Sequence, residues 1–150
     1  MNSIIKSWLE SYPIQNSNDE ENALKEIIQQ IALCGLWRSK FFEHAAFYGG
    51  TALRIFYGLD RFSEDLDFSL IKSTPDFNLM PYYQAVKAEC EQYGLEVSIV
   101  EKQKQSNTGI QSAFIKSDTL FNHLQIRYHR TKQLKIKLEI DISPPGLFQT

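Results

Sequence analysis

Apolar residues recur at helical spacing twice within the first forty positions. Residues 1–12 predict a short amphipathic helix. A polar break at residues 13–19 separates it from a longer helical series at residues 20–38. We expect Asn18 or Asp19 to cap this second helix, because short polar side chains accept hydrogen bonds from the first free amides of a helix.

Beyond residue 40, short apolar runs and alternating apolar and polar positions predict strands. These strands are expected at residues 45–48, 65–70, 95–100, 110–115 and 134–142. Helices are expected between them, one over residues 51–57 that ends at Gly58 and one over residues 77–93 that ends at Gly94. Residues 120–128 fit either element, and we favour a strand.

This order of elements predicts an α/β (or α+β) fold with a mixed β-sheet and flanking helices. We expect a single domain over residues 1–150, in which the helices of residues 1–40 precede a strand-bearing core at residues 41–150. A chain of 150 residues is long enough to bury a substantial core.

Composition narrows the function classes only slightly. Hydrophobic residues make up 43% and charged residues 23% of the chain, as in ordinary globular proteins. The net charge of −2 gives no overall attraction to nucleic acid, so such a substrate would need a local basic patch. Cys34 and Cys90 lack metal-ligand spacing and are expected to be buried free thiols. No apolar run is long enough to span a membrane, and we expect a cytoplasmic protein.

Candidate chemistry begins where the strand at 45–48 meets the following helix. Gly49 and Gly50 allow backbone amides to approach an anion closely, and the helix N-terminus adds partial positive charge. Shortly afterwards, Asp65 and Asp67 alternate with apolar residues and therefore point to the same side of a strand. Paired carboxylates repel each other unless a cation lies between them, and their hard oxygen atoms suit Mg²⁺. A phosphate cradle followed by a carboxylate pair predicts phosphoryl or nucleotidyl transfer.

Each of these signals has an ordinary structural explanation when taken alone. A Gly-Gly pair is usually a turn, and an Asp-x-Asp segment is common on solvated strands. Arg61 could clamp a phosphate or neutralise nearby carboxylates. Ser63 could bind phosphate or cap the turn before the strand, and we favour the cap. The two motifs gain weight from their order and their separation of fewer than twenty residues.

Residues 49–53 together with residues 61–68 resemble the first motif of the AbiEii/AbiGii toxin family, which are nucleotidyltransferases of the DNA polymerase β-like superfamily. The superfamily pattern is a hydrophobic-Gly-Gly/Ser turn, an Asp-x-Asp/Glu pair and a third carboxylate on a later strand. Residues 135–145 resemble a second family motif, Lys-x-Glu-hydrophobic-Asp followed by Pro-Pro. The resemblance covers roughly residues 40–150 and implies the polymerase β-like core.

The resemblance implies metal-dependent transfer of a nucleoside monophosphate from an NTP to an acceptor. Asp65 and Asp67 would hold two Mg²⁺ ions, and Glu139, or else Asp141, would bind the catalytic metal and assist deprotonation of the acceptor. A second group of residues would contact the β- and γ-phosphates. That group is Gly49, Gly50 and Thr51, with Arg61 and Lys137 as further candidates.

The strand at 134–142 bears on this expectation. Lys135, Lys137, Glu139 and Asp141 share one side of it, which suits a site that binds an anion at one end and a metal at the other. The alternative is a solvated strand face. Given the upstream motif, we expect this strand beside the Asp65–Asp67 strand. Basic residues in the second half could form a track for RNA or triphosphate, or serve solubility alone: Lys102, Lys104, Arg127, His129, Arg130, Lys132, Lys135 and Lys137.

By the same resemblance, members act as toxins of type IV toxin–antitoxin systems, with a cognate antitoxin as partner, and some modify tRNA 3′ ends. Members usually continue into a helical C-terminal half, so we expect a chain that ends at Thr150 to be truncated. Two alternatives stay open. One is a catalytically silent module that binds a nucleotide or an antitoxin, and the other is a small-molecule nucleotidyltransferase of the antibiotic-modifying kind.

Overall fold

A computed structural model of the chain describes residues 2–58, 62–74, 76–102, 109–117 and 133–143. Within these residues, five strands form one sheet in the order β1-β2-β5-β4-β3. The strands are β1 (Ala45–Tyr48), β2 (Asp65–Leu70), β3 (Ser98–Lys102), β4 (Ile110–Ser117) and β5 (Leu134–Asp141). β2 and β5 are parallel, whereas the other neighbouring pairs are antiparallel. The expected mixed sheet is therefore confirmed, and so is the expected adjacency of β2 and β5.

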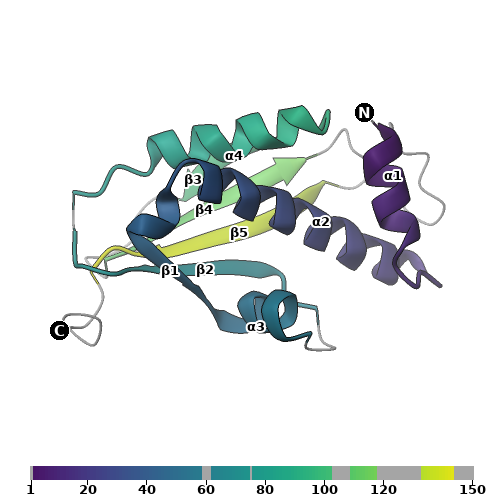
Figure 1. The fold of residues 1–150 in the computed structure, drawn as a ribbon, viewed down its shortest axis with the longest axis horizontal. Coiled ribbons are helices and arrows are strands. Elements are labelled where there is room, and N and C mark those ends of the chain that lie inside the picture. The colour runs from purple at the N-terminus through teal and green to yellow at the C-terminus, as the bar shows by residue number, and fades with distance from the viewer. Residues whose placement is uncertain (1, 59–61, 75, 103–108, 118–132, 144–150) are drawn as a thin grey trace.

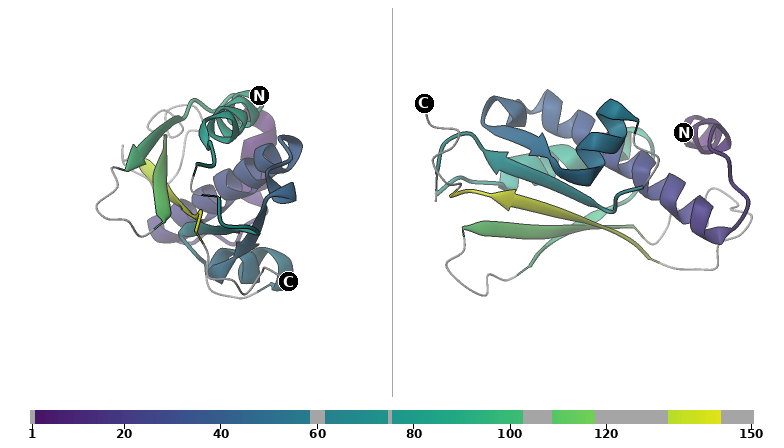
Figure 2. Two further views of the ribbon diagram at one scale, coloured as in Figure 1. Left: turned by 90° about the vertical axis from the view of Figure 1, so that its left-hand side faces the viewer. Right: turned by 90° about the horizontal axis from the view of Figure 1, so that it is seen from below.

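Helices cover one face of this sheet (Figures 1 and 2). They are α1 (Asn2–Glu10), α2 (Ser17–Arg38), α3 (Gly49–Tyr57) and α4 (Met80–Gln92), with a 3-10 turn at Phe41–Glu43. α2 and α4 lie side by side, and a Cβ placed on Gly35 of α2 would lie 2.9 Å from the carbonyl oxygen of Ala85. Glycine therefore lets these two helices approach closely. α3 packs at the other end of the sheet, against β1 and β2.

The alternation of β2 and β5 separates the two faces of the sheet. Leu66, Phe68, Leu138 and Ile140 are all buried and join one apolar core with α2 and α4. We call this side the core face. The residues between them in sequence are only partly buried and point to the opposite side of the sheet.

Two helix starts differ from the sequence-based expectation. α2 begins at Ser17 and its cap is Asn16, whose side chain accepts a hydrogen bond from the Asp19 amide at 2.8 Å. Asp19 instead lies in the first turn, where a negative charge favours the helix dipole. α4 begins at Met80 and not at residue 77, with Pro81 in its first turn, a position where the missing amide hydrogen costs nothing.

The third strand also begins later than expected. The Leu95 amide donates to the carbonyl of Cys90, so Leu95 belongs to the turn that follows α4 and the strand starts at Ser98. Gly94 adopts a positive φ of 76°, as expected for a residue that ends a helix. Residues 120–128 lie outside the described residues.

Both cysteines are free thiols. Cys90 is buried, and burial raises the pKa of its thiol to about 12. Cys34 is only partly buried, contrary to expectation. None of the described helices combines the length and the apolar character needed to cross a membrane.

Candidate active site

The junction of β1 and α3 brings backbone against a carboxylate. Both glycines, expected as a turn, form the first residues of α3, and Gly49 has a φ of +90° that disfavours any residue with a side chain. A Cβ at Gly49 would lie 2.7 Å from Oδ2 of Asp67. The absence of a side chain therefore lets the Asp67 carboxylate lie directly beside the start of α3.

Gly50 and Thr51 complete this first turn. A Cβ at Gly50 would lie 3.2 Å from Oγ of Ser63, so the serine side chain packs against the turn. The hydroxyl of Thr51, which is buried, donates to the carbonyl oxygen of Asp65. That hydroxyl holds α3 to β2. The amides at the start of a helix have no partner within the helix, and in α3 they include the amides of these residues.

The second face of the sheet gathers the acidic residues, and we call it the carboxylate face. In the parallel ladder of β2 and β5, Asp67 lies opposite Glu139 and Asp65 lies opposite Lys137. The Lys137 ammonium Nζ lies 2.9 Å from Oε1 of Glu139. The structure thus brings four predicted site residues from two motifs, 72 residues apart in sequence, onto adjacent positions.

The electrostatics of the carboxylate face are those of crowded negative charge. Partial burial, followed by the negative charges of Glu139 and Asp65, raises the pKa of Asp67 to about 6. Burial also raises the pKa of Asp65, an effect that Lys137 opposes. Its hydrogen bond to Glu139 raises the pKa of Lys137. A cation at this position would relieve the repulsion between the carboxylates.

Asp141 lies two residues after Glu139 on β5, on the same face of the sheet. It pairs with Ser69 in the ladder, and its Oδ1 accepts a hydrogen bond of 3.0 Å from the Ser143 amide. Of the two candidates for a third carboxylate, Glu139 is the one directly beside Asp67. Asp141 is still near enough for its charge to raise the pKa of Tyr48.

Comparison with known proteins gives the family of this chain. Residues 31–149 match the family described as the nucleotidyl transferase AbiEii toxin of type IV toxin–antitoxin systems. The chain belongs to the AbiEii family. A crystal structure of a candidate nucleotidyltransferase from H. pylori also matches, with 23% identity and a TM-score of 0.48 over 80% of this chain and 45% of that one. The chain thus spans less than half the length of that protein. No curated protein matches the sequence.

Tyr48 is a residue of the candidate site that sequence reasoning missed. It lies opposite Asp67 in the ladder and is 50% exposed. Burial and then the charges of Asp67, Asp141 and Glu139 raise the pKa of its hydroxyl. On the other flank, Ser112 of β4 lies opposite Glu139. Period-2 alternation within β1 places Tyr48 on the side opposite to Phe47, and so on this face, but only knowledge of the register identifies Ser112.

The carboxylate face offers oxygen ligands for a divalent metal ion. Among the residues that the structure describes, no three acidic, histidine or cysteine side chains converge closely enough to hold a metal ion by themselves. Mg²⁺ usually takes only one or two carboxylates and fills its remaining positions with water and substrate phosphates. Asp67 and Glu139, with Asp65 on the same face, fit that donor set.

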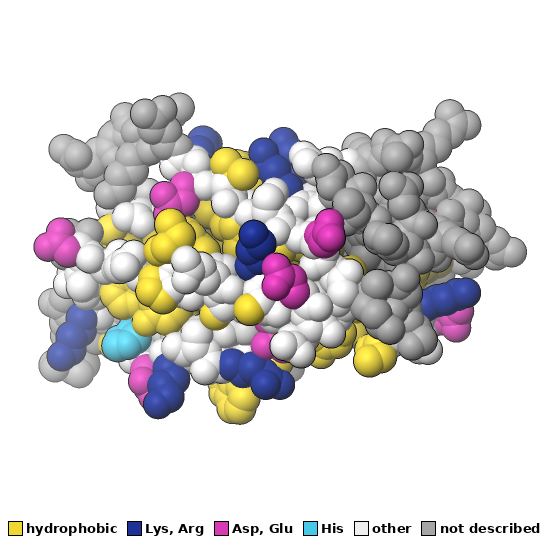
Figure 3. All heavy atoms as spheres, turned by 90° about the horizontal axis from the view of Figure 1, so that it is seen from above, with side chains coloured by type: hydrophobic (Ala, Val, Ile, Leu, Met, Phe, Trp, Pro, Cys, Tyr) yellow, Lys and Arg dark blue, Asp and Glu magenta, His cyan; other side chains and the backbone are white. Residues whose placement is uncertain are grey.

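Of the predicted basic track, Lys102, Lys135 and Lys137 lie within the described residues. Lys104, Arg127, His129, Arg130 and Lys132 lie outside them, as does Arg61. Figure 3 shows the side of the molecule on which α4 lies, and there the side chains of Lys and Arg are interspersed with those of Asp and Glu. Lys135 lies 5.8 Å from the ring of Phe114, which occupies the position opposite Lys137 in the ladder.

Proposed function

We propose that this AbiEii-family chain transfers a nucleoside monophosphate from an NTP to an acceptor with the help of Mg²⁺. The observation that supports the proposal most strongly is the position of Asp67. Its carboxylate lies between Glu139 on the adjacent strand and the backbone of Gly49 at the start of α3. A cation bound there would contact the carboxylates and a phosphate held by the helix N-terminus.

Binding of the triphosphate is assigned to the start of α3. The amides of Gly49, Gly50 and Thr51 would donate to the β- and γ-phosphates, because they lack partners within the helix. Lys137 would move its ammonium from Glu139 to a phosphate oxygen, and Arg61 is a further candidate for this contact. Ser63 packs against Gly50 and would support the turn.

Asp65, Asp67 and Glu139 are assigned to Mg²⁺, with Asp141 as the reserve candidate. When bound, Mg²⁺ neutralises the charge of the triphosphate and of the transition state. Glu139 would accept the proton of the acceptor hydroxyl. The acceptor oxygen forms a bond to the α-phosphorus, the bond from this phosphorus to the β-phosphate oxygen breaks, and pyrophosphate leaves.

The family description as a toxin of a type IV toxin–antitoxin system supports two finer proposals. We assign the acceptor to RNA, with the 3′ end of tRNA as the first candidate, and we assign the partner to a cognate antitoxin. Both concern a complete toxin, of which this chain resembles a part.

Calorimetry of NTP binding tests the proposal. Wild type should bind an NTP only when Mg²⁺ is present, and the Asp65→Ala/Asp67→Ala double variant should lose this binding. Glu139→Gln and Asp141→Asn form a matched pair, since both remove a charge from the same face of β5. We expect Glu139→Gln to weaken binding more than Asp141→Asn, and the reverse order would overturn the choice of Glu139.

Transfer itself needs a second assay. Incubation with α-labelled NTP and Mg²⁺ should label total RNA and leave small aminoglycoside-like acceptors unlabelled. Labelled small acceptors would favour an antibiotic-modifying enzyme. Metal-dependent NTP binding without any transfer would favour a catalytically silent nucleotide-binding module. Absence of binding in the wild type would contradict the proposed function for this chain.

A further inference from the structure

One side of α2 contacts both segments that flank the candidate site. Lys25, Glu26 and Gln29 lie within about one helical turn of each other. They contact α3 and residues 62–64, which lead into β2. All three precede residue 31, where the match to the AbiEii family begins. We infer that Glu26 is a positioning residue, which fixes the distance between the start of α3 and the carboxylate face by holding Arg54. This inference rests on the proposed function.

The central contact is an ion pair that is largely buried. Nε of Arg54 donates to Oε2 of Glu26, and Nη2 of the same guanidinium lies 3.4 Å from Oε1. The side chains of Glu26 and Arg54 are only 9% and 19% exposed. Two-point contact of a planar guanidinium with a carboxylate restricts orientation as well as distance. The pair therefore fixes α3 relative to α2.

Arg54 also contacts the segment that leads into β2. Its guanidinium lies 3.7 Å from the centre of the Phe62 ring, a distance typical of cation–π contact. The hydroxyl of Tyr12, in the connection between α1 and α2, donates to Oε1 of Glu26 at 2.8 Å. Glu26 thus joins the N-terminal region, α3 and the approach to β2 in one network.

Gln29 and Lys25 hold the same approach to β2. Nε2 of Gln29 donates to the carbonyl oxygen of Ser63 at 2.8 Å, and Nζ of Lys25 lies 3.5 Å from Oε1 of Glu64. Gln29 is fully buried, and within the described residues its Oε1 has no hydrogen-bond partner. A buried amide that satisfies only one of its ends is costly. The hydrogen bond that the Gln29 amide does make, from Nε2 to Ser63, holds Ser63 beside Gly50.

These contacts matter because the geometry of the site is tight. Gly49 begins the helix that carries Arg54, and a Cβ on Gly49 would lie only 2.7 Å from the Asp67 carboxylate. A small rotation or shift of α3 would therefore change the distance between the helix amides and the carboxylates. Misplacement of catalytic groups by about 1 Å can cost on the order of a hundredfold in rate.

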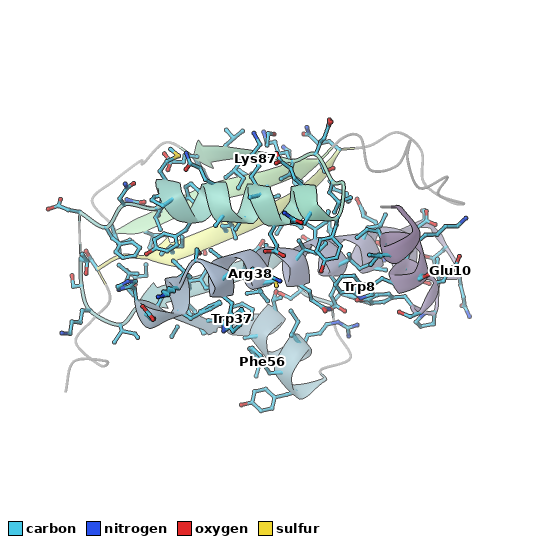
Figure 4. The ribbon with its side chains drawn as sticks, turned by 45° about the horizontal axis from the view of Figure 1, so that its top comes forward. Trp8, Glu10, Trp37, Arg38, Phe56 and Lys87 are labelled. Carbon is cyan, nitrogen blue, oxygen red and sulfur yellow. The ribbon has the colours of Figure 1, made fainter. Side chains whose placement is uncertain are left out.

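The test compares Glu26→Gln with a matched control, Glu89→Gln. Glu89 lies on α4 and pairs with Arg38 of α2 at 3.2 Å, and its side chain is also 9% exposed. Figure 4 shows Arg38 on the side of α2 that faces α4, whereas α3 carries Phe56 on the other side. Both variants remove one charge from an ion pair of α2, so both should lose stability. Only Glu26→Gln should disturb α3.

Two measurements are made on folded protein, below the thermal transition of each variant. Calorimetry with Mg²⁺ and each of the four common NTPs should show about tenfold weaker binding for Glu26→Gln and unchanged binding for Glu89→Gln. Hydrogen exchange should be faster at the amides of α3 in Glu26→Gln alone. Arg54→Gln should reproduce both effects, and the Glu26→Gln/Arg54→Gln double variant should be no worse than either single variant.

Equal loss of NTP affinity in Glu26→Gln and Glu89→Gln would overturn the inference, because it would show a general effect of lost stability. Unchanged exchange of the α3 amides in Glu26→Gln would overturn it as well. If the wild type binds no NTP, the proposed function fails on its own. The exchange comparison then still decides whether Glu26 positions α3.

Discussion

The two faces of β2 and β5 are built from alternate residues of the same strands and differ completely in character. On the core face, Leu66, Phe68, Leu138 and Ile140 are at most 3% exposed and pack beneath the helices. On the carboxylate face, charged residues of both strands are only partly buried and crowd together. Partial burial, and after it the negative charges of Glu139 and Asp65, raises the pKa of Asp67, so this face disfavours the ionised carboxylate. Stability therefore comes from the core face, whereas the partly buried charges of the carboxylate face oppose it.

The largest effect on stability is expected on the core face. Leu138→Ala should lower the free energy of unfolding by about 2–5 kcal/mol, because it removes buried methyl groups and leaves a cavity. Lys135→Ala, on the exposed side of the same strand, should change it by less than about 1 kcal/mol. Urea denaturation measures both, and equal losses would show that the two faces do not divide their roles in this way.

Gly49→Ala should have the next largest effect and should act on both stability and binding. A side chain there is disfavoured by the positive φ and would clash with the Asp67 carboxylate. We expect a loss of about 1–3 kcal/mol from backbone strain, together with the loss of Mg²⁺-dependent NTP binding.

Gly58→Ala is the matched control for this prediction. Gly58 has a similar positive φ of 69°, but a Cβ placed on it would meet no atom within 4 Å. This variant should lose stability through backbone strain and retain NTP binding. Unweakened NTP binding by Gly49→Ala would contradict the assignment of the helix start to the phosphates.

Some residues of the two faces could be placed from the sequence, and others could not. Alternation is a local property, so Asp65, Asp67 and the charged residues of β5 could be placed on one face from the sequence alone. Pairing register depends on contacts between distant segments. The choice between Glu139 and Asp141, and the place of Tyr48 opposite Asp67, therefore required the structure.

The contacts that hold α3 show the same limit. Glu26 and Arg54 are 28 residues apart, and each follows the ordinary pattern of a charged residue on a helix. Nothing local in the sequence distinguishes a buried partner from a solvated side chain at these positions. The start of α2 was mispredicted because Asn16, Asn18 and Asp19 are all suitable caps, and local sequence does not distinguish between them.

The dependence of stability on pH should reveal the strain on the carboxylate face. The pKa of Asp67 rises from an ordinary 3.8 to about 6 on folding, so the folded protein binds this proton more tightly than the unfolded chain. The resulting stabilisation is fully present below pH 3.8 and is lost as the pH rises through about 6. Asp67→Asn should remove this contribution.

Urea denaturation between about pH 3 and about pH 7, a range that contains both pKa values, measures the difference. Relative to wild type, Asp67→Asn should gain stability as the pH rises through this range. Parallel pH profiles for the two proteins would show that the crowded carboxylates do not oppose folding. Saturating Mg²⁺ should reduce the difference, because a bound cation favours the ionised carboxylate.

The smallest effect on stability should come from Lys137→Met, although this variant sharpens the comparison most. Lys137 and Glu139 form a partly exposed pair, with side chains 29% and 35% exposed, so its loss should cost less than about 1 kcal/mol. The positive charge of Lys137 lowers the pKa of Asp67, whereas the negative charge of Glu139 raises it. Titration followed by the carboxyl carbon resonance of Asp67 should therefore show a pKa above about 6 in Lys137→Met and a lower one in Glu139→Gln. Shifts in the same direction would mean that both variants act by rearranging the face, whereas opposite shifts at nearly constant stability would show that its charges can be tuned without disturbing the core.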